Sequence, residues 1–168
     1  MVLAVTVSRN GTGRIGRIVR IAAALALACA GLLTVPTASL AQTVFDRTLG
    51  ELPESIAIDR AGAIYVTLSP RGEIRRIAPD GSQSTVAQIS PPGAGFGPLG
   101  LAFDRDGDLY ATAGTFDPAS NGVYRVGAGA TSERIAGSAA IVLPNAIAFD
   151  GQGRMYVSDS VTGSIYRA

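Results

Sequence analysis

The segment Pro53-Glu-Ser-Ile-Ala-Ile-Asp59 occurs twice more in the chain in a closely related form. Its counterparts are Pro98-Leu-Gly-Leu-Ala-Phe-Asp104 and Pro144-Asn-Ala-Ile-Ala-Phe-Asp150, so the final aspartates are 45 and 46 positions apart. A glycine follows each aspartate by three residues, and a tyrosine follows it by six. Five residue types therefore recur in register three times, which indicates a structural repeat.

Each repeat has the pattern of short strands joined by turns. In the first unit, residues 56–58 form an apolar run before the turn at 59–62, and the β-branched and aromatic segment 64–67 follows. The segments 72–77 and 84–89 complete the unit as third and fourth strands. Four short strands in about 45 residues are typical of one blade of a β-propeller.

The sequence therefore predicts an all-β fold, an incomplete β-propeller of roughly three four-stranded blades over residues 42–168. We place the first blade at about 53–90, the second at about 98–137 and a third, incomplete blade from 144 onward. A β-sandwich with coincidental similarity is the alternative, whereas a WD-type propeller needs tryptophan, which the chain lacks. Because propellers have about 4 to 8 blades, we expect either a piece of a longer protein, which we favour, or an assembly of several chains.

The N-terminal segment, residues 1–41, has the features of a helical signal peptide. Arginines precede an almost unbroken apolar run at residues 21–35, and the small residues Ser39 and Ala41 suit cleavage after position 41. We therefore expect a secreted or periplasmic bacterial protein with no membrane span after processing. An uncleaved anchor and lipidation of Cys29, the only cysteine, are the alternatives.

The composition excludes several functions. The chain has no histidine, and every one of its 14 basic residues is arginine. Four arginines lie in residues 1–41, which leaves 14 − 4 = 10 against 13 acidic residues, a net charge of −3 for the rest. A mildly acidic body gives no basis for nucleic-acid binding. Histidine-based triads, imidazole metal ligands and lysine Schiff bases are likewise excluded for this chain.

Three segments carry a resemblance to a known family. At Pro53-Glu54-Ser55, Pro144-Asn145-Ala146 and Met155-Tyr-Val-Ser-Asp-Ser160, the chain resembles the SMP-30/gluconolactonase/LRE-like family, and more widely the strictosidine-synthase and NHL-like six-bladed propellers. The resemblance covers roughly residues 45–168. It implies that the chain is the N-terminal part of a six-bladed propeller.

The resemblance also implies a divalent cation, often Ca²⁺, on the propeller axis. The family takes its ligands from the starts of the innermost strands, and the corresponding positions here are Glu54, Leu99 and Asn145. Glu54 and Asn145 are thus the expected metal ligands, since the second blade of the family supplies none. Further ligands would follow position 168, so we expect cation binding by this chain alone to be weak or absent. No other cofactor is expected.

The intact parent protein is expected to be a metal-dependent hydrolase of lactones or related esters, and this chain by itself is expected to be inactive. The absence of histidine in this portion argues against a lyase of the virginiamycin type, as far as these blades are concerned. The alternatives are a non-catalytic, NHL-like propeller that binds a partner outside the cell and a truncated reading frame without activity. Self-association through open blade edges is also expected.

Other polar residues of the repeat have simpler explanations. Asp59, Asp104 and Asp150 recur at the same hairpin, so we expect them to cap backbone N–H groups of the turn. The repeated tyrosines are expected to pack between blades. Asp159 differs, because it follows the second strand where other units have Ser69 and Gly114. The sequence identifies no catalytic residue, and Asp159 is the one candidate.

Overall fold

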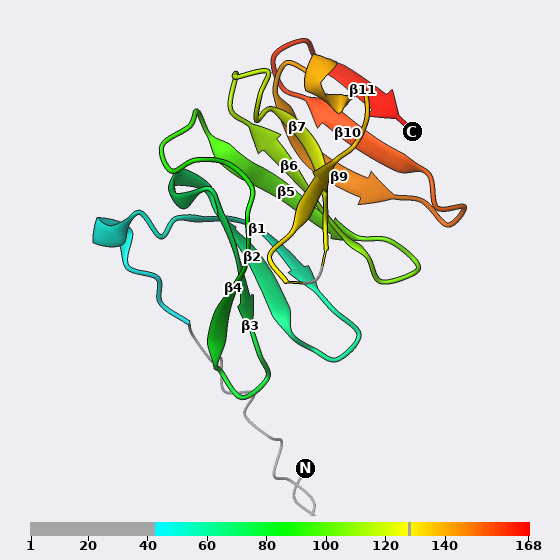
Figure 1. Cartoon of the computed structure of the whole chain (residues 1–168). Helices are drawn as coiled ribbons and strands as arrows, with labels where there is room; N and C mark the ends of the chain where they lie inside the picture. Colours follow the sequence, from blue (N-terminus) through cyan, green and yellow to red (C-terminus); the bar gives the residue numbers. More distant parts are fainter. Residues whose placement is uncertain (1–42, 128) are drawn as a thin grey trace, which may run out of the picture. The chain divides into compact units, whose positions relative to one another are not determined.

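A computed structural model of the chain describes residues 43–127 and 129–168 (Figure 1). The predicted signal peptide lies outside the described residues. The first sheet contains β1 (Pro53–Ile58), β2 (Ile64–Leu68), β3 (Glu73–Ile77) and β4 (Gln83–Gln88), in that order. All neighbouring strands in this sheet are antiparallel. The sequence thus predicted the strands of the first unit to within one residue at most boundaries.

Two further sheets repeat this order. The second sheet contains β5 (Gly97–Phe103), β6 (Leu109–Gly114), β7 (Gly122–Val126) and β8 (Ser132–Arg134). The third contains β9 (Pro144–Phe149), β10 (Met155–Asp159) and β11 (Ser164–Arg167). The helical elements of the described residues are short 3-10 turns: η1 (Arg47–Leu49), η2 (Ser69–Arg71) and η3 (Ser138–Ala140). The prediction of an all-β fold is confirmed, and the fourth strand of the second unit has only three residues.

The third strand of the first unit begins one residue later than predicted, at Glu73 instead of Gly72. Gly72 has φ of 70°, in the left-handed region that favours glycine. A Cβ atom there would lie 2.0 Å from the carbonyl oxygen of Ser90. Only glycine therefore allows the chain to turn into β3 so close to the end of β4.

The repeated aspartates cap their hairpins, as predicted. Asp59 Oδ1 accepts hydrogen bonds from the backbone N–H groups of Ala61 and Ala63, both at 2.9 Å. Asp104 and Asp150 make the corresponding contacts in their own turns. These aspartates therefore have a structural role that accounts for their recurrence.

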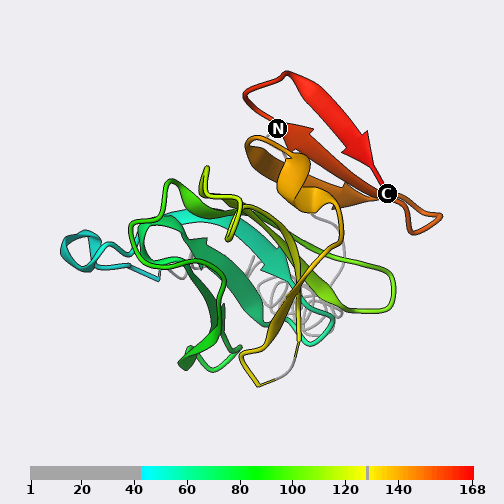
Figure 2. The ribbon, with the colours of Figure 1, turned by 45° about the horizontal axis from the view of Figure 1, so that its top comes forward.

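Apolar side chains fill the spaces between adjacent sheets. β5 contacts both β1 and β9, so the innermost strands lie side by side (Figures 1 and 2). Between the first and second sheets, the rings of Tyr65 and Phe103 meet edge to face, with centroids 5.2 Å apart. Between the second and third sheets, the rings of Tyr110 and Phe149 are 5.0 Å apart. The prediction that the tyrosines pack between blades is confirmed for these two.

Hydroxyl groups on the second strands of the first two sheets link the innermost strands of neighbouring sheets. The Thr67 hydroxyl accepts from the Ser55 N–H and donates to the Leu99 carbonyl, each at 2.9 Å. The Thr112 hydroxyl accepts from the Gly100 N–H at 2.7 Å and donates to the Asn145 carbonyl at 2.5 Å. The first sheet is thus joined to the second, and the second to the third, by the same polar bridge at the same position of the repeat.

This bridge predicts a clear stability effect at Thr112, which is fully buried. Replacing Thr112 with valine keeps the shape of the side chain but leaves the Gly100 N–H and the Asn145 carbonyl without their partner. We expect the free energy of unfolding, measured by urea denaturation, to fall by about 2 kcal/mol. Thr112→Ser keeps the hydroxyl and should lose less than half as much. A loss in Thr112→Ser as large as that in Thr112→Val would show that packing of the methyl group contributes as much as the bridge, whereas no loss in Thr112→Val would contradict the role of the bridge.

Among residues 43–127 and 129–168, no helix is long and apolar enough to cross a membrane.

Candidate functional site

The predicted ligand positions lie near the beginnings of the innermost strands β1, β5 and β9. Glu54 is exposed on β1, and its carboxylate has no hydrogen bond or ion pair to any described residue. Leu99, at the corresponding place on β5, is buried. Leu99 therefore contributes packing at the second position, while the Glu54 carboxylate is open to a ligand.

Asn145 on β9 is half-buried, and hydrogen bonds hold both its side chain and its backbone. Its side-chain Nδ2 donates to Ser160 Oγ at 2.9 Å, and its backbone carbonyl accepts from the Thr112 hydroxyl. The side-chain Oδ1 has no hydrogen-bond partner among the described residues. This oxygen is therefore held in place and remains able to accept a bond from outside the chain.

Asp159, the candidate catalytic residue, is buried with only 2% of its surface exposed. Its carboxylate accepts hydrogen bonds from four backbone N–H groups at 2.9 to 3.2 Å, those of Val142, Leu143, Val161 and Thr162. These contacts join the segment before β9 to the hairpin after β10. The carboxylate is therefore occupied by its own chain.

The pKa of Asp159 reflects this setting. Burial by itself would raise the pKa, but the hydrogen bonds from the backbone N–H groups outweigh it and lower the pKa to about 2. Asp159 is therefore ionised at neutral pH and poorly suited to carry a proton. Its position supports a structural role, and a part in catalysis stays only a sequence-based prediction.

The donor set can be compared with what a hard cation needs. Ca²⁺ takes 6 to 8 oxygen ligands, and Glu54 and Asn145 supply a carboxylate and an amide oxygen of the right chemical type. Within the described part of the chain, no group of three or more histidine, cysteine, aspartate or glutamate residues could hold a metal ion. Glu54 and Asn145 thus have the chemical type that a hard cation prefers, while most of the ligands of the cation must come from other groups.

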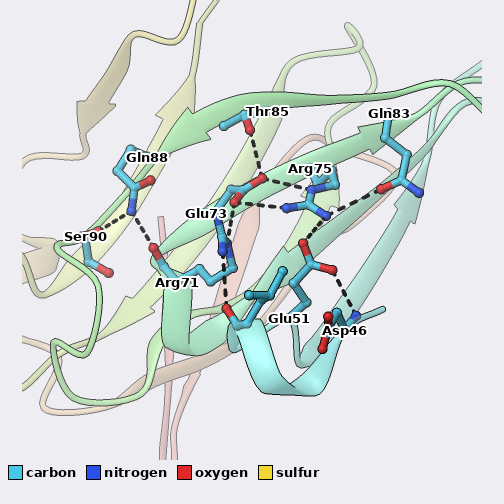
Figure 3. Close-up of polar contacts among 10 residues, drawn as sticks. Asp46, Glu51, Arg71, Glu73, Arg75, Gln83, Thr85, Gln88 and Ser90 are labelled. Carbon is cyan, nitrogen blue, oxygen red and sulfur yellow. Dashed lines mark hydrogen bonds and ion pairs between the residues drawn. The ribbon is translucent and has the colours of Figure 1, made fainter. Parts of the chain in front are cut away.

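A second polar cluster, which the sequence analysis missed, lies on the outer part of the first sheet (Figure 3). Glu73 on β3 is only 2% exposed. It accepts from the Nε atoms of Arg71 and Arg75 and from the Thr85 hydroxyl, each at 2.9 Å. Arg75 also reaches Glu51, with 2.6 Å between Nη1 and Oε1. The cluster fastens the segment before β1 onto the first sheet.

The charge of Glu73 is fully compensated. Burial would raise the pKa of its carboxyl, but hydrogen bonds from Arg75, Arg71 and Thr85 hold the pKa below the usual range. The repeat gave no signal for this cluster, since β7 and β11 have Gly122 and Ser164 at the corresponding position. Because the Glu73 carboxylate is surrounded by partners from its own chain, the cluster has a structural function.

Comparison with known proteins shows which solved structures have a similar fold. No model of a known protein family and no curated protein matches the chain. Among solved structures, the chain is similar to a catalytically inactive histidine-to-alanine variant of virginiamycin B lyase from Staphylococcus aureus with quinupristin. The TM-score is 0.54 and the identity 16%, over 70% of this chain and 41% of the lyase.

Two other solved structures match this chain with similar TM-scores and sequence identities. A streptogramin B lyase is 14% identical over 70% of this chain and 40% of its own, with a TM-score of 0.52. A protein of unknown function from Bacteroides thetaiotaomicron is 17% identical over 71% of this chain and 36% of its own, with a TM-score of 0.53. At these identities the similarity is one of fold.

The lyases are six-bladed propeller proteins. The three sheets of this chain are therefore successive propeller blades, and the predicted incomplete propeller is confirmed. The chain spans about two fifths of the length of the lyases that it matches.

Proposed function

We propose that this chain forms part of an exported propeller of the SMP-30/gluconolactonase/LRE-like type that hydrolyses lactones or related esters with a bound divalent cation. In this proposal Glu54 and Asn145 are cation ligands. The observation that supports it most is that both occupy the same position of the repeat and both have an oxygen without a partner in the described chain. The third member of this set, Leu99, is apolar, as the family pattern requires.

The proposed chemistry gives each residue a limited task. When bound, the cation would polarise the carbonyl of the substrate and lower the pKa of a water molecule. Glu54 contributes negative charge at the propeller axis. Asn145 contributes a neutral oxygen, which the bond between its Nδ2 and Ser160 keeps in one orientation. Neither residue is proposed to transfer a proton.

The comparisons bear on the reaction type only weakly. The virginiamycin B lyase that carries alanine in place of one histidine is catalytically inactive. This chain contains no histidine, so its 168 residues supply no group of that kind. The proposed cation-assisted hydrolysis uses groups of a kind that these residues do supply, a carboxylate and an amide oxygen.

The proposal predicts a weak, site-specific response to Ca²⁺. In an NMR titration of the purified chain, the side-chain amide signals of Asn145 should shift with added Ca²⁺, because its Oδ1 becomes a ligand. Glu54→Gln removes the negative charge and should abolish the shift. The chain alone is expected to hydrolyse lactones no faster than background.

The matched control is Glu133→Gln, because Glu133 is an exposed glutamate on β8 with no ion pair among the described residues. This variant should respond to Ca²⁺ as the unmodified chain does. A shift that survives Glu54→Gln, or one that Glu133→Gln also removes, would assign the response to nonspecific binding and contradict the proposed site.

A second candidate function is a non-catalytic propeller that binds a partner outside the cell. It is favoured by the absence, in the described residues, of a close group of metal-ligating side chains and by the saturated contacts of Asp159. The Ca²⁺ titration distinguishes the candidates, since a scaffold requires no response at Asn145.

A further inference from the structure

Two exposed aromatic side chains, which we call the phenylalanine pair, lie in contact at one end of the second sheet. Phe96 precedes β5 and Phe116 follows β6, and each is 53% exposed. Their ring centroids are 5.7 Å apart, and the ring planes are inclined by 60°. The Phe96 N–H donates to the Gly114 carbonyl at the end of β6. The two loops that carry the pair therefore leave the same end of the second sheet (Figure 1).

This end of the sheet is also the end at which the proposed cation ligands lie. Phe96 is three residues before Leu99, whose position in β5 corresponds to that of Glu54 in β1 and of Asn145 in β9. The threonine bridges described above join the start of β5 to the starts of β1 and β9. The phenylalanine pair therefore belongs to the sheet between the two ligand positions and lies at the same end of the sheets.

Hydrogen bonds tie each loop of the pair to a neighbouring sheet. Ser69, which follows β2, donates its hydroxyl to the Phe96 carbonyl. In the β6–β7 loop, Asn121 is only 4% exposed. Its Nδ2 donates to the Ile141 carbonyl in the segment before β9, and its Oδ1 accepts from the Thr115 N–H at 3.2 Å. The backbone next to each ring is therefore held in place.

The backbone around the pair is closely packed and strained. Gly95 has φ of 54°, and a Cβ atom there would lie 2.6 Å from the Thr115 carbonyl oxygen. Phe116 itself has φ of 59°, which is uncommon for a large side chain. Burial does not compensate for this strain, because about half of the Phe116 ring surface is exposed. Strain of this kind is concentrated at binding and catalytic sites, so the pair is a candidate for contact with a ligand.

The polar groups beside the pair indicate what kind of ligand fits. Residues 91–95, before the first ring, have no polar side chain. In the β6–β7 loop, the Ser120 hydroxyl donates to Thr115 Oγ1 at 2.9 Å. One carboxylate oxygen of Asp117 accepts from the backbone N–H two residues later, also at 2.9 Å. A ligand rich in hydroxyl groups would find few partners here, whereas an apolar group would remove exposed ring surface from water.

We propose that the phenylalanine pair binds the apolar substituent of the substrate, an alkyl chain or an aromatic ring attached to the lactone or ester group. This inference rests on the proposed function and narrows its substrate class, because lactones with apolar substituents are then preferred over polyhydroxylated sugar lactones. Two rings inclined to each other present apolar surface on two sides of such a substituent. The ligand positions Glu54 and Asn145 are left for the reacting end of the molecule.

Two lactones with the same five-membered ring test the inference. γ-Nonalactone has a pentyl chain on the ring, and galactono-1,4-lactone has hydroxyl groups instead. In NMR titrations of the purified chain without Ca²⁺, the ring signals of Phe96 and Phe116 should shift saturably with γ-nonalactone. The dissociation constant should be at least about tenfold lower than that of galactono-1,4-lactone. Ring signals that do not respond, or equal affinities for the two lactones, would overturn the inference.

Variants of the pair show whether binding occurs at these rings. Phe116→Gly removes one ring at a position whose φ suits glycine, and Phe96→Ala removes the other. Each should raise the dissociation constant of γ-nonalactone at least about fivefold, with unchanged circular dichroism. The matched control is Ile58→Ala, because Ile58 is 61% exposed and ends β1, at the opposite end from Glu54. This control should keep its affinity, and an equal loss there would assign the binding to nonspecific partition.

The apolar subsite and the cation site can fail separately. The Ca²⁺ titration followed at Asn145 tests the cation site, and the lactone titration requires no cation. Ring shifts without a Ca²⁺ response would support apolar binding at the pair and contradict the proposed function. A Ca²⁺ response without ring shifts would contradict the subsite alone. Ring signals that change with protein concentration in the absence of lactone would assign the pair to contact between copies of the chain and overturn the inference.

Discussion

Replacing Asp159 with alanine is expected to lower the free energy of unfolding by about 4 kcal/mol, because several hydrogen bonds are lost at once. The carboxylate is the common acceptor for the N–H groups of Val142, Leu143, Val161 and Thr162. Alanine leaves these donors in a buried place without an acceptor. Urea denaturation monitored by circular dichroism measures the change, which is large against the usual 5 to 15 kcal/mol of a domain.

The pKa of the Asp159 carboxylate predicts how the stability loss in Asp159→Ala depends on pH. Its pKa in the folded chain, about 2, is below its ordinary value of 3.8. Its contribution is therefore complete above the ordinary value and is lost as the pH falls toward 2. The stability difference between the unmodified chain and Asp159→Ala should accordingly shrink between about pH 4 and pH 2.

Asp80→Ala is the control for Asp159→Ala. Asp80 is exposed and caps only its own turn, through the N–H and hydroxyl of Ser82. Its replacement should lower the free energy of unfolding by no more than about 1 kcal/mol. If Asp159→Ala were as mild as Asp80→Ala, the buried carboxylate would not hold the segment before β9, and a functional role for Asp159 would regain support.

Replacing Glu73 with alanine is expected to lower the free energy of unfolding by about 3 kcal/mol. The change leaves Arg75, whose side chain is only 13% exposed, with half of its ion-pair partners. It also removes the acceptor of Arg71 and Thr85. The segment that contains Glu51 should become more accessible to protease, because its contact with Arg75 loses its support.

A paired variant distinguishes a structural charge cluster from simple packing. Glu73→Leu combined with Arg75→Met removes both members of the ion pair and fills the space with apolar atoms. We expect this double variant to recover at least half of the stability lost in Glu73→Ala, since the charge of Arg75 is removed together with that of its most buried partner. Glu51 loses its ion pair with Arg75 but keeps the hydrogen bond from the Asp46 N–H. No recovery would indicate that Glu51 requires the charge of Arg75, or Arg71 that of Glu73, for its own placement.

Much of the fold followed from local pattern. The turns at Asp59, Asp104 and Asp150, the alternating strands and the repeat length of about 45 residues all report interactions within one sheet, and such interactions depend on neighbouring residues. The same register pointed to Glu54 and Asn145, because equivalent residues of successive blades occupy equivalent places. The structure leaves an unpaired oxygen on each, although their part in binding a cation remains a prediction.

Other features could not be predicted because they depend on contacts between distant segments. Glu73 is ordinary in sequence and becomes buried only when Arg71, Arg75 and Thr85 surround it. Asp159 resembled a site residue because it breaks the repeat, whereas its partners come from the segment before β9 and from its own hairpin.

Strand pairing, turn chemistry and apolar alternation act between neighbouring residues and recur with the repeat, so the amino-acid pattern was enough to predict the blade and its repetition. Which faces are covered and which buried polar groups find partners became visible only in three dimensions, because burial and hydrogen bonding between sheets depend on where whole sheets lie. Ile74 and Val123 are therefore completely buried, whereas Ile165 at the equivalent position of the third sheet is 68% exposed.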